Sequence, residues 1–210
     1  MKSLLTCLLA IFSLCGTTNG MLVIAEWTDF AAPYSATGGP QTADLNVMVN
    51  GGGPGITDGT DLQIRVNDTA FNDPGTFLDL TVDTTQFEDI VLAYEVVKSD
   101  GGGPNNAPDT INWSYFLDGS TTATAAGTNA IGAGTNSEMI DLSAIFDVDN
   151  ASSVRLRGTF SGANGGSSSS LTFDNIQVSA TAVPEPSAFI FLAVVLGLGY
   201  GWRFAWPNRR

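Results

Sequence analysis

Residues 61–67 read Asp61-Leu62-Gln63-Ile64-Arg65-Val66-Asn67, an unbroken alternation of polar and apolar residues. Successive side chains of a β-strand point to opposite faces of a sheet, so this two-residue period is typical of a strand with one buried face. A helix would repeat its apolar residues every three or four positions, and that spacing is nearly absent between residues 21 and 182. The stretch therefore predicts a half-buried strand and an all-β chain around it.

Similar stretches follow one another through residues 21–182, and together they predict about nine strands. The clearest of them are Met21–Trp27, Leu45–Val49, Asp61–Asn67, Leu78–Val82, Ile90–Val97, Trp113–Leu117, Val154–Arg157 and Leu171–Ala180. Turn-forming, glycine-rich segments separate them, and the one helix candidate is short, around Leu142–Phe146. Many short strands with such turns predict an antiparallel β-sandwich of the jelly-roll-like type.

The last predicted strand carries an irregularity. Its apolar residues stand at odd positions in Leu171 and Phe173 but at even positions in Ile176 and Val178. Parity cannot change along a regular strand, so the pattern predicts a β-bulge at Asp174-Asn175.

Charge and composition exclude several functions. Residues 21–182 hold twenty acidic residues against four basic ones (Arg65, Lys98, Arg155 and Arg157), a formal charge of −16 that repels nucleic acid. The chain has no histidine, and its two cysteines, Cys7 and Cys15, lie close to the N-terminus. Catalytic triads, thiol chemistry and zinc sites built on imidazole or thiolate are therefore excluded from this region.

The N-terminus has the three parts of a secretory signal peptide. Lys2 is followed by the apolar stretch Leu4–Cys15 and then by small and polar residues up to Gly20. We therefore expect residues 1–20 to direct export, with cleavage after Gly20. A lipoprotein attached through Cys15 and an uncleaved anchor are open alternatives.

The C-terminus also has three parts, all within residues 183–210. Pro184, Glu185, Pro186 and Ser187 come first, and the prolines keep this segment extended. An uncharged apolar run of 15 residues, Ala188–Trp202, follows and predicts a transmembrane helix if the stem of Arg203 reaches toward the head groups. Arg203, Arg209 and Arg210 then place the end of the chain in the cytoplasm. A buried core helix is the alternative.

In this order and place, the three parts resemble the PEP-CTERM sorting signal of exported bacterial proteins. The resemblance implies recognition of Pro184, Glu185 and Pro186 by an exosortase, a membrane-embedded enzyme. It also implies an inner-membrane precursor that is later released to the cell surface or extracellular matrix of a Gram-negative-type bacterium producing exopolysaccharide. In that family the arginines form one block, whereas here Arg203 comes early and residues 204–208 separate it from the final pair.

The last predicted strands of residues 21–182 resemble those of a second group of proteins. Asp141-Leu142-Ser143 and Phe173–Val178 resemble the final strands of PEP-CTERM passenger domains and of carbohydrate-binding jelly rolls. In the latter, the resemblance implies a structural calcium held by an acidic residue of the last strand, here Asp174, together with Glu26 or Asp29.

Three further groups of side chains are candidates for sugar binding or glycoside hydrolysis. Trp27, Trp113 and Tyr34 could form a platform for sugar rings or belong to the core. Asp79 with Asp83, or Glu138 with Asp141, could be a glycosidase carboxylate pair, although Asp79 and Asp83 fit a solvated face better.

The sequence thus predicts a non-enzymatic exported protein with a structural or adhesive sandwich (residues 21–182) and a sorting signal (residues 183–210). The alternatives are a carbohydrate-binding adhesin of the exopolysaccharide matrix and a permanently anchored inner-membrane protein that faces the periplasm.

Overall fold

The computed structural model describes residues 20–31, 34–49, 55–57, 59–66, 71–73, 75–101, 106–163 and 169–183. These ranges contain eleven strands and a short 3₁₀ helix, η2 (Phe146–Val148). The strands are β1 (Leu22–Trp27), β2 (Ala43–Met48), β3 (Gly55–Thr57), β4 (Leu62–Val66), β5 (Phe77–Val82), β6 (Phe87–Ser99), β7 (Thr110–Leu117), β8 (Thr124–Ala130), β9 (Gly134–Asp141), β10 (Val154–Ser161) and β11 (Ser169–Ala182). Among these residues no helix has the length and apolar character to cross a membrane.

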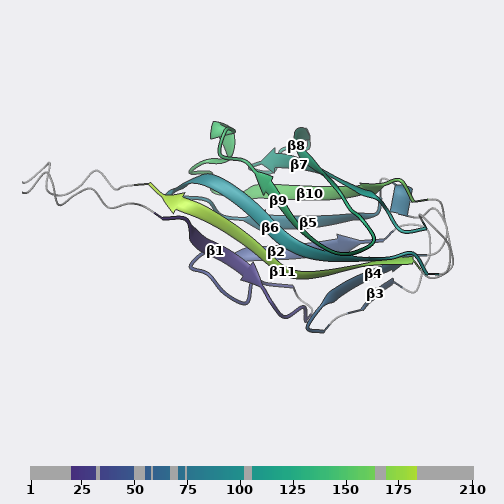
Figure 1. Ribbon diagram of the computed structural model, residues 1–210. Coiled ribbons are helices and arrows are strands. Elements are labelled where there is room, and N and C mark those ends of the chain that lie inside the picture. The colour runs from purple at the N-terminus through teal and green to yellow at the C-terminus, as the bar shows by residue number, and fades with distance from the viewer. Residues whose placement is uncertain are drawn as a thin grey trace, which may run out of the picture.

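The strands form two antiparallel sheets that pack face to face, which confirms the predicted all-β sandwich (Figure 1). One sheet has the order β3-β4-β11-β6-β9, and β1 pairs with the second half of β11. The other has the order β2-β5-β10-β7-β8. The chain crosses between the sheets at almost every connection, and only β3–β4 and β7–β8 are hairpins within one sheet. Such alternation is typical of double-sheet jelly rolls.

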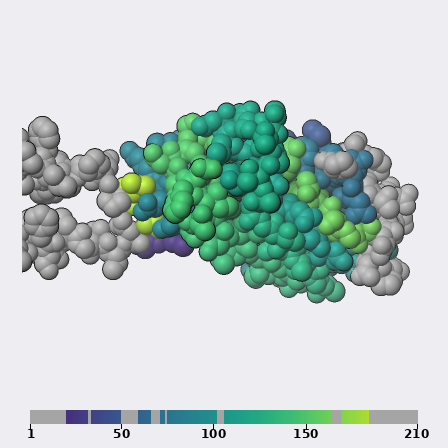
Figure 2. All heavy atoms as spheres, turned by 90° about the horizontal axis from the view of Figure 1, so that it is seen from above, coloured from purple at the N-terminus to yellow at the C-terminus, as the bar shows by residue number. Residues whose placement is uncertain are grey.

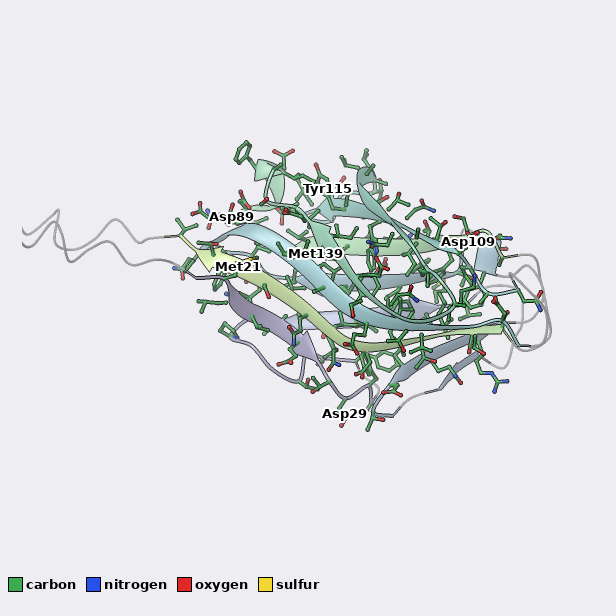
Figure 3. The ribbon with its side chains drawn as sticks, viewed as in Figure 1. Met21, Asp29, Asp89, Asp109, Tyr115 and Met139 are labelled. Carbon is green, nitrogen blue, oxygen red and sulfur yellow. The ribbon has the colours of Figure 1, made fainter. Side chains whose placement is uncertain are left out.

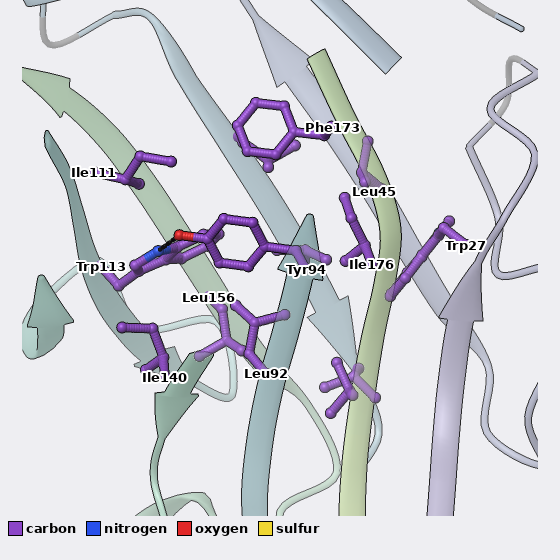
Figure 4. Packing of buried hydrophobic residues seen from close by; sticks show 14 of the residues in the cluster. Trp27, Leu45, Leu92, Tyr94, Ile111, Trp113, Ile140, Leu156, Phe173 and Ile176 are labelled. Carbon is purple, nitrogen blue, oxygen red and sulfur yellow. Dashed lines mark hydrogen bonds between the residues drawn. The ribbon is translucent and has the colours of Figure 1, made fainter. Parts of the chain in front are cut away.

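The core lies between the sheets and follows the two-residue pattern of the sequence. Trp27, Phe173 and the inward residues of every long strand are buried there (Figure 4). The Trp113 Nε1 donates to the Tyr94 hydroxyl at 3.1 Å, and that hydroxyl donates to the Asn129 Oδ1 at 2.8 Å. Burial raises the pKa of the Tyr94 hydroxyl, so this group stays neutral and keeps the buried polar atoms paired.

The bulge predicted in the last strand is confirmed. The register of β11 against β6 shifts between Asp174 and Gln177, and Asn175 has a φ of 48°. Asparagine tolerates this left-handed backbone better than most residues. The shift restores the apolar side chains of Ile176 and Val178 to the core after the change of parity.

Two details differ from the sequence expectations. The segment predicted as a helix around Leu142–Phe146 is a turn, and the 3₁₀ helix η2 only begins at Phe146. Strands β3, β8 and β9 were not predicted. Strand β3 is only three residues long, and the threonine, alanine and glycine residues of β8 and β9 show no apolar alternation. All three are edge strands that pair on one side only, so they need few apolar residues.

The two ends of the sandwich chain lie side by side. Leu22 of β1 pairs with Ala180 of β11, and Figure 2 shows the beginning of the first strand (purple) and the end of the last (yellow) at the same end of the molecule. The Val183 N–H donates to the Gln86 carbonyl at 2.8 Å. Backbone hydrogen bonding therefore reaches Val183, one residue beyond the end of β11. The predicted signal peptide up to Asn19 and the tail from Pro184 lie outside the described residues.

Candidate binding face

The register of the five-stranded sheet places one set of side chains on the face that points away from the core. Strand β10 alternates buried and half-buried residues, and its half-buried positions stand opposite the outward positions of β5 and β7. Phe77 and Phe116 are buried but do not belong to the core cluster, as expected for residues of this outward side. We call this set the outer face: Asp44, Asn46, Met48, Phe77, Asp79, Thr81, Asn112, Ser114, Phe116, Arg155, Arg157 and Thr159.

An ion pair occupies the middle of the outer face. The Arg157 Nε donates to the Asp79 Oδ1 at 2.7 Å, and its Nη2 donates to Oδ2 at 2.6 Å. The same guanidinium lies 3.6 Å from the centre of the Phe77 ring. The hydrogen bonds that Arg157 donates to Asp79 raise the pKa of Arg157, while its burial opposes that shift. The stack explains why Asp79 is only 5% exposed although it lies on an outward face.

Arg155 lies two residues earlier on the same strand and is arranged differently. Its guanidinium carbon is 4.0 Å from the centre of the Phe116 ring, a cation–π distance. Its Nε is buried without a hydrogen-bond partner. Within the described ranges Arg155 forms no ion pair, since the two recorded pairs are Arg157–Asp79 and Lys98–Asp100.

A polar row continues the outer face beyond the two arginines. The Asn112 Nδ2 donates to the Ser161 hydroxyl at 3.0 Å, and the Thr128 hydroxyl lies 3.2 Å from the Asn112 Oδ1. The Thr159 hydroxyl donates to the Asn112 carbonyl at 3.3 Å. The outer face thus combines stacked planar groups with hydroxyl and amide groups that can donate and accept.

A small cavity of about 120 Å³ opens at the end of the sandwich from which β11 leaves. Its lining combines hydroxyl groups with one carboxylate and comprises Tyr115, Leu117, Ser120, Thr122, Thr124 and Asp147. Tyr115 comes from β7, as Figure 3 shows, and Asp147 comes from η2. Phe146, next to Asp147, is 81% exposed. The cavity has room for a few water molecules but not for a sugar chain.

The sequence candidates for a sugar platform have different positions. Trp27 is fully buried and its Nε1 donates to the Tyr34 carbonyl at 3.1 Å, while Trp113 is 2% exposed and bonds Tyr94. Neither indole can meet a ligand, so the platform hypothesis is wrong for both tryptophans and the core alternative is confirmed. Tyr34 packs against the edge of the core.

The three predicted calcium ligands do not form a cluster in this structure. Glu26 accepts a hydrogen bond from the Gln177 side-chain amide at 2.9 Å. Asp174 accepts from the backbone N–H and the side-chain amide of Asn175, at 2.7 and 3.3 Å. Asp29 is exposed after β1 (Figure 3). The described part of the chain has no group of three or more acidic, histidine or cysteine side chains that could hold a metal ion. Calcium binding stays a prediction from the resemblance.

The candidate carboxylate pairs are engaged in local contacts. Asp79 is buried against Arg157, so its assignment to a solvated face is wrong. Asp83 accepts from the Thr85 N–H at 2.8 Å, and Asp141 accepts from the Ser143 N–H at 2.9 Å. Glu138 stands opposite Tyr94 on β6. The predicted sorting and topology residues Pro184, Glu185, Pro186, Ser187, Arg203, Arg209 and Arg210 lie outside the described residues.

The sequence did not single out the outer face as a site. Its alternation showed that Arg155 and Arg157 point opposite to Val154 and Leu156. Their partners Asp79, Phe77 and Phe116 lie between 39 and 80 residues away in the sequence. Only the cross-strand register brings these residues together.

No protein-family model matches the chain, and no curated protein matches it. Among solved structures, one described as CBM4 structure and function is similar at 11% identity and a TM-score of 0.43, over 74% of this chain and 94% of that one. A carbohydrate-binding module of family 29 is 12% identical with a TM-score of 0.42, over 78% and 89%. A variant of xylanase 10C from Cellvibrio japonicus in complex with xylopentaose is 16% identical with a TM-score of 0.45, over 66% of this chain but 27% of that one.

Proposed function

We propose that this chain is an exported, non-catalytic surface protein whose β-sandwich binds extracellular polysaccharide through the outer face. The observation that carries the proposal is the row of stacked planar groups on an open sheet face, Arg157 over Phe77 and Arg155 over Phe116. A sugar chain presents flat apolar patches and a ring of hydroxyl groups. A row of planar groups flanked by amides and hydroxyls matches both.

The chemistry of the domain supports a binding role more than a catalytic one. The candidate carboxylates Asp79, Asp83 and Asp141 all accept local hydrogen bonds. The formal charge of −16 across residues 21–182 opposes nucleic acids and suits a soluble extracellular domain. An open face also suits a polymer, because a chain can enter and leave it along its length.

We propose further that the tail delivers the sandwich to the cell surface. Pro184–Pro186 is the segment recognised by an exosortase, Ala188–Trp202 holds the precursor in the inner membrane, and the arginines set its orientation. The position of the last paired residue supports this division: Val183 bonds Gln86, so the folded domain reaches to the edge of the motif. A permanently anchored protein would have the same parts but would keep its tail.

A matched pair of amide substitutions tests glycan binding. Asn112 lies on the outer face, and Gln63 is a half-buried amide on the other sheet whose Nε2 bonds the Thr172 hydroxyl at 3.3 Å. We expect Asn112→Leu to weaken binding to the exopolysaccharide of the host by about tenfold, because several hydrogen bonds near the ligand are lost. Gln63→Leu should leave binding unchanged. The measurement is a glycan-array screen followed by calorimetry on the full chain in detergent.

Two outcomes would contradict the proposal. One is the absence of binding to any glycan on the array by the wild-type chain, with its melting curve showing that it is folded. The other is an equal loss of binding in both variants, which would indicate that the ligand does not contact the outer face.

A further inference from the structure

Arg155 is an unusual cation for this domain. Residues 21–182 contain four basic residues, of which Arg157 and Lys98 pair with acids, while Arg65 on β4 and Arg155 on β10 form no ion pair among the described residues. Arg155 has no such partner among the described residues, and neither of its terminal nitrogens forms a hydrogen bond within them. With Nε buried and one side of the guanidinium against Phe116, much of its hydration is already lost.

On the same face, the guanidinium of Arg157 has both a stacking partner and a hydrogen-bonded carboxylate. Arg157 stacks on Phe77 at 3.6 Å and bonds both carboxylate oxygens of Asp79. Arg155 repeats the stacking half of this arrangement on Phe116 at 4.0 Å and lacks the carboxylate. The ring of Phe116 lies between the two cations, 5.5 Å from the Arg157 guanidinium.

The local charge is consistent with an anionic partner. The acids of the outer face are Asp79, which is paired, and Asp44, whose Oδ1 accepts from the Ser35 hydroxyl at 3.0 Å. Two arginines balance these two acids, so the outer face is formally neutral in a domain that is otherwise strongly acidic. An anion therefore meets less repulsion from the residues of this face than the formal charge of the domain as a whole suggests.

From these contacts we infer that the outer face selects glycans with carboxylate groups, and that Arg155 binds the carboxylate of a uronic acid unit. This inference rests on the proposed function and narrows its ligand. The carboxylate would bind the two terminal nitrogens of Arg155, because its Nε is buried, whereas Asp79 pairs with the Nε and Nη2 of Arg157. The neighbouring amide and hydroxyl groups of the outer face would then bond the sugar hydroxyls.

The test compares one sugar chain with and without its charge. Calorimetry of the full chain in detergent measures binding of oligogalacturonate and of the same oligomer as its methyl ester. We expect the acid to bind about tenfold more tightly than the ester, as charge-assisted pairs are stronger than neutral ones. Arg155→Gln should remove this difference, and Arg155→Lys should keep part of it. Arg65→Gln, which removes a cation from the other sheet, should change nothing.

The outcomes separate this inference from the proposed function. If the wild-type chain binds neutral glycans and shows no preference for the acid, the uronate inference is overturned and glycan binding stands. The same holds if Arg155→Gln keeps the full preference. If no glycan binds at all, both fail. Melting curves of each variant show that it is folded, so a loss of binding reports on the contact.

Discussion

At the scale of single residues, the buried acids of this domain differ in how many hydrogen bonds their carboxylate oxygens accept. Asp79 is buried but receives two hydrogen bonds from Arg157. Asp149, beside η2, has one carboxylate oxygen buried without a partner. Burial raises the pKa of Asp149, a backbone hydrogen bond from Asp89 opposes that shift, and the charges of Asp89 and Glu88 add to it. Asp149 is therefore a local source of instability at neutral pH.

We expect Asp149→Asn to stabilise the fold at pH 7, because asparagine keeps the shape and one acceptor but carries no charge. The native pKa of Asp149 lies above its unfolded value, so the native state takes up a proton first as the pH falls. Its penalty is thus full at neutral pH and disappears between the native pKa and the unfolded value near ~3.9. Urea unfolding at pH 7 and at pH 3.5 measures this, using buffers chosen to bracket ~3.9. An equal gain at both pH values would show that charge is not the cause.

At the scale of strands, the sequence predicted the fold well and the site poorly, for physical reasons. Burial on one face of a strand produces a local alternation in the sequence. The buried residues Ile64, Leu80 and Trp113 therefore indicated their strands. The bulge in β11 was visible for the same reason, as a change of parity. Pairing between distant strands leaves no such trace, so the stack of Arg157 on Phe77 and its contact with Asp79 could not be predicted. Trp27 and Trp113 were wrongly considered for a sugar platform, because residue type alone does not distinguish a ring in the core from an exposed ring.

The bulge gives a direct test of backbone conformation in β11. Asn175 has a φ of 48°, and its side-chain amide reaches Glu95 at 3.3 Å. We expect Asn175→Val to destabilise the domain by about 1–2 kcal/mol, because a β-branched residue is strained in this region. Asn175→Gly should cost less, since glycine loses the side-chain contacts but not the backbone geometry. Thermal or urea unfolding gives both values.

Ser179→Val, at a half-buried outward position of the same strand, is the control and should be close to neutral. If Asn175→Val were as stable as Asn175→Gly, the left-handed backbone at this position would be refuted.

At the scale of the whole molecule, the sandwich and its predicted sorting signal meet without a spacer. Val183, the residue after β11 and the last one that the structure describes, donates its N–H to the Gln86 carbonyl, and Pro184 is the next residue. An enzyme that cleaves at Pro184–Pro186 must therefore work against the folded end of β11. We expect cells of the host to yield a mature protein that ends near this motif and lacks Arg210. Glu185→Ala should cause the full-length precursor to accumulate in the inner membrane.

Cell fractionation with mass spectrometry of the C-terminal peptide measures this outcome, and Asp174→Ala, which changes an acid of β11 outside the motif, is the control. A mature wild-type protein that retains Arg210 would favour permanent anchoring and would exclude release by processing.

The adjacency of β1 and β11 also has a practical side. A reporter fused at Met21, the predicted mature N-terminus, would stand next to the end of β11, since Leu22 pairs with Ala180. We expect it to obstruct a peptidase that approaches the predicted cleavage segment. The exposed turn at Gly132-Ala133, between β8 and β9, lies at the opposite pole, where Gly134 pairs with Lys98. An epitope inserted there would lie away from both ends of residues 21–183, so we expect it to report on the protein without disturbing the predicted export and processing.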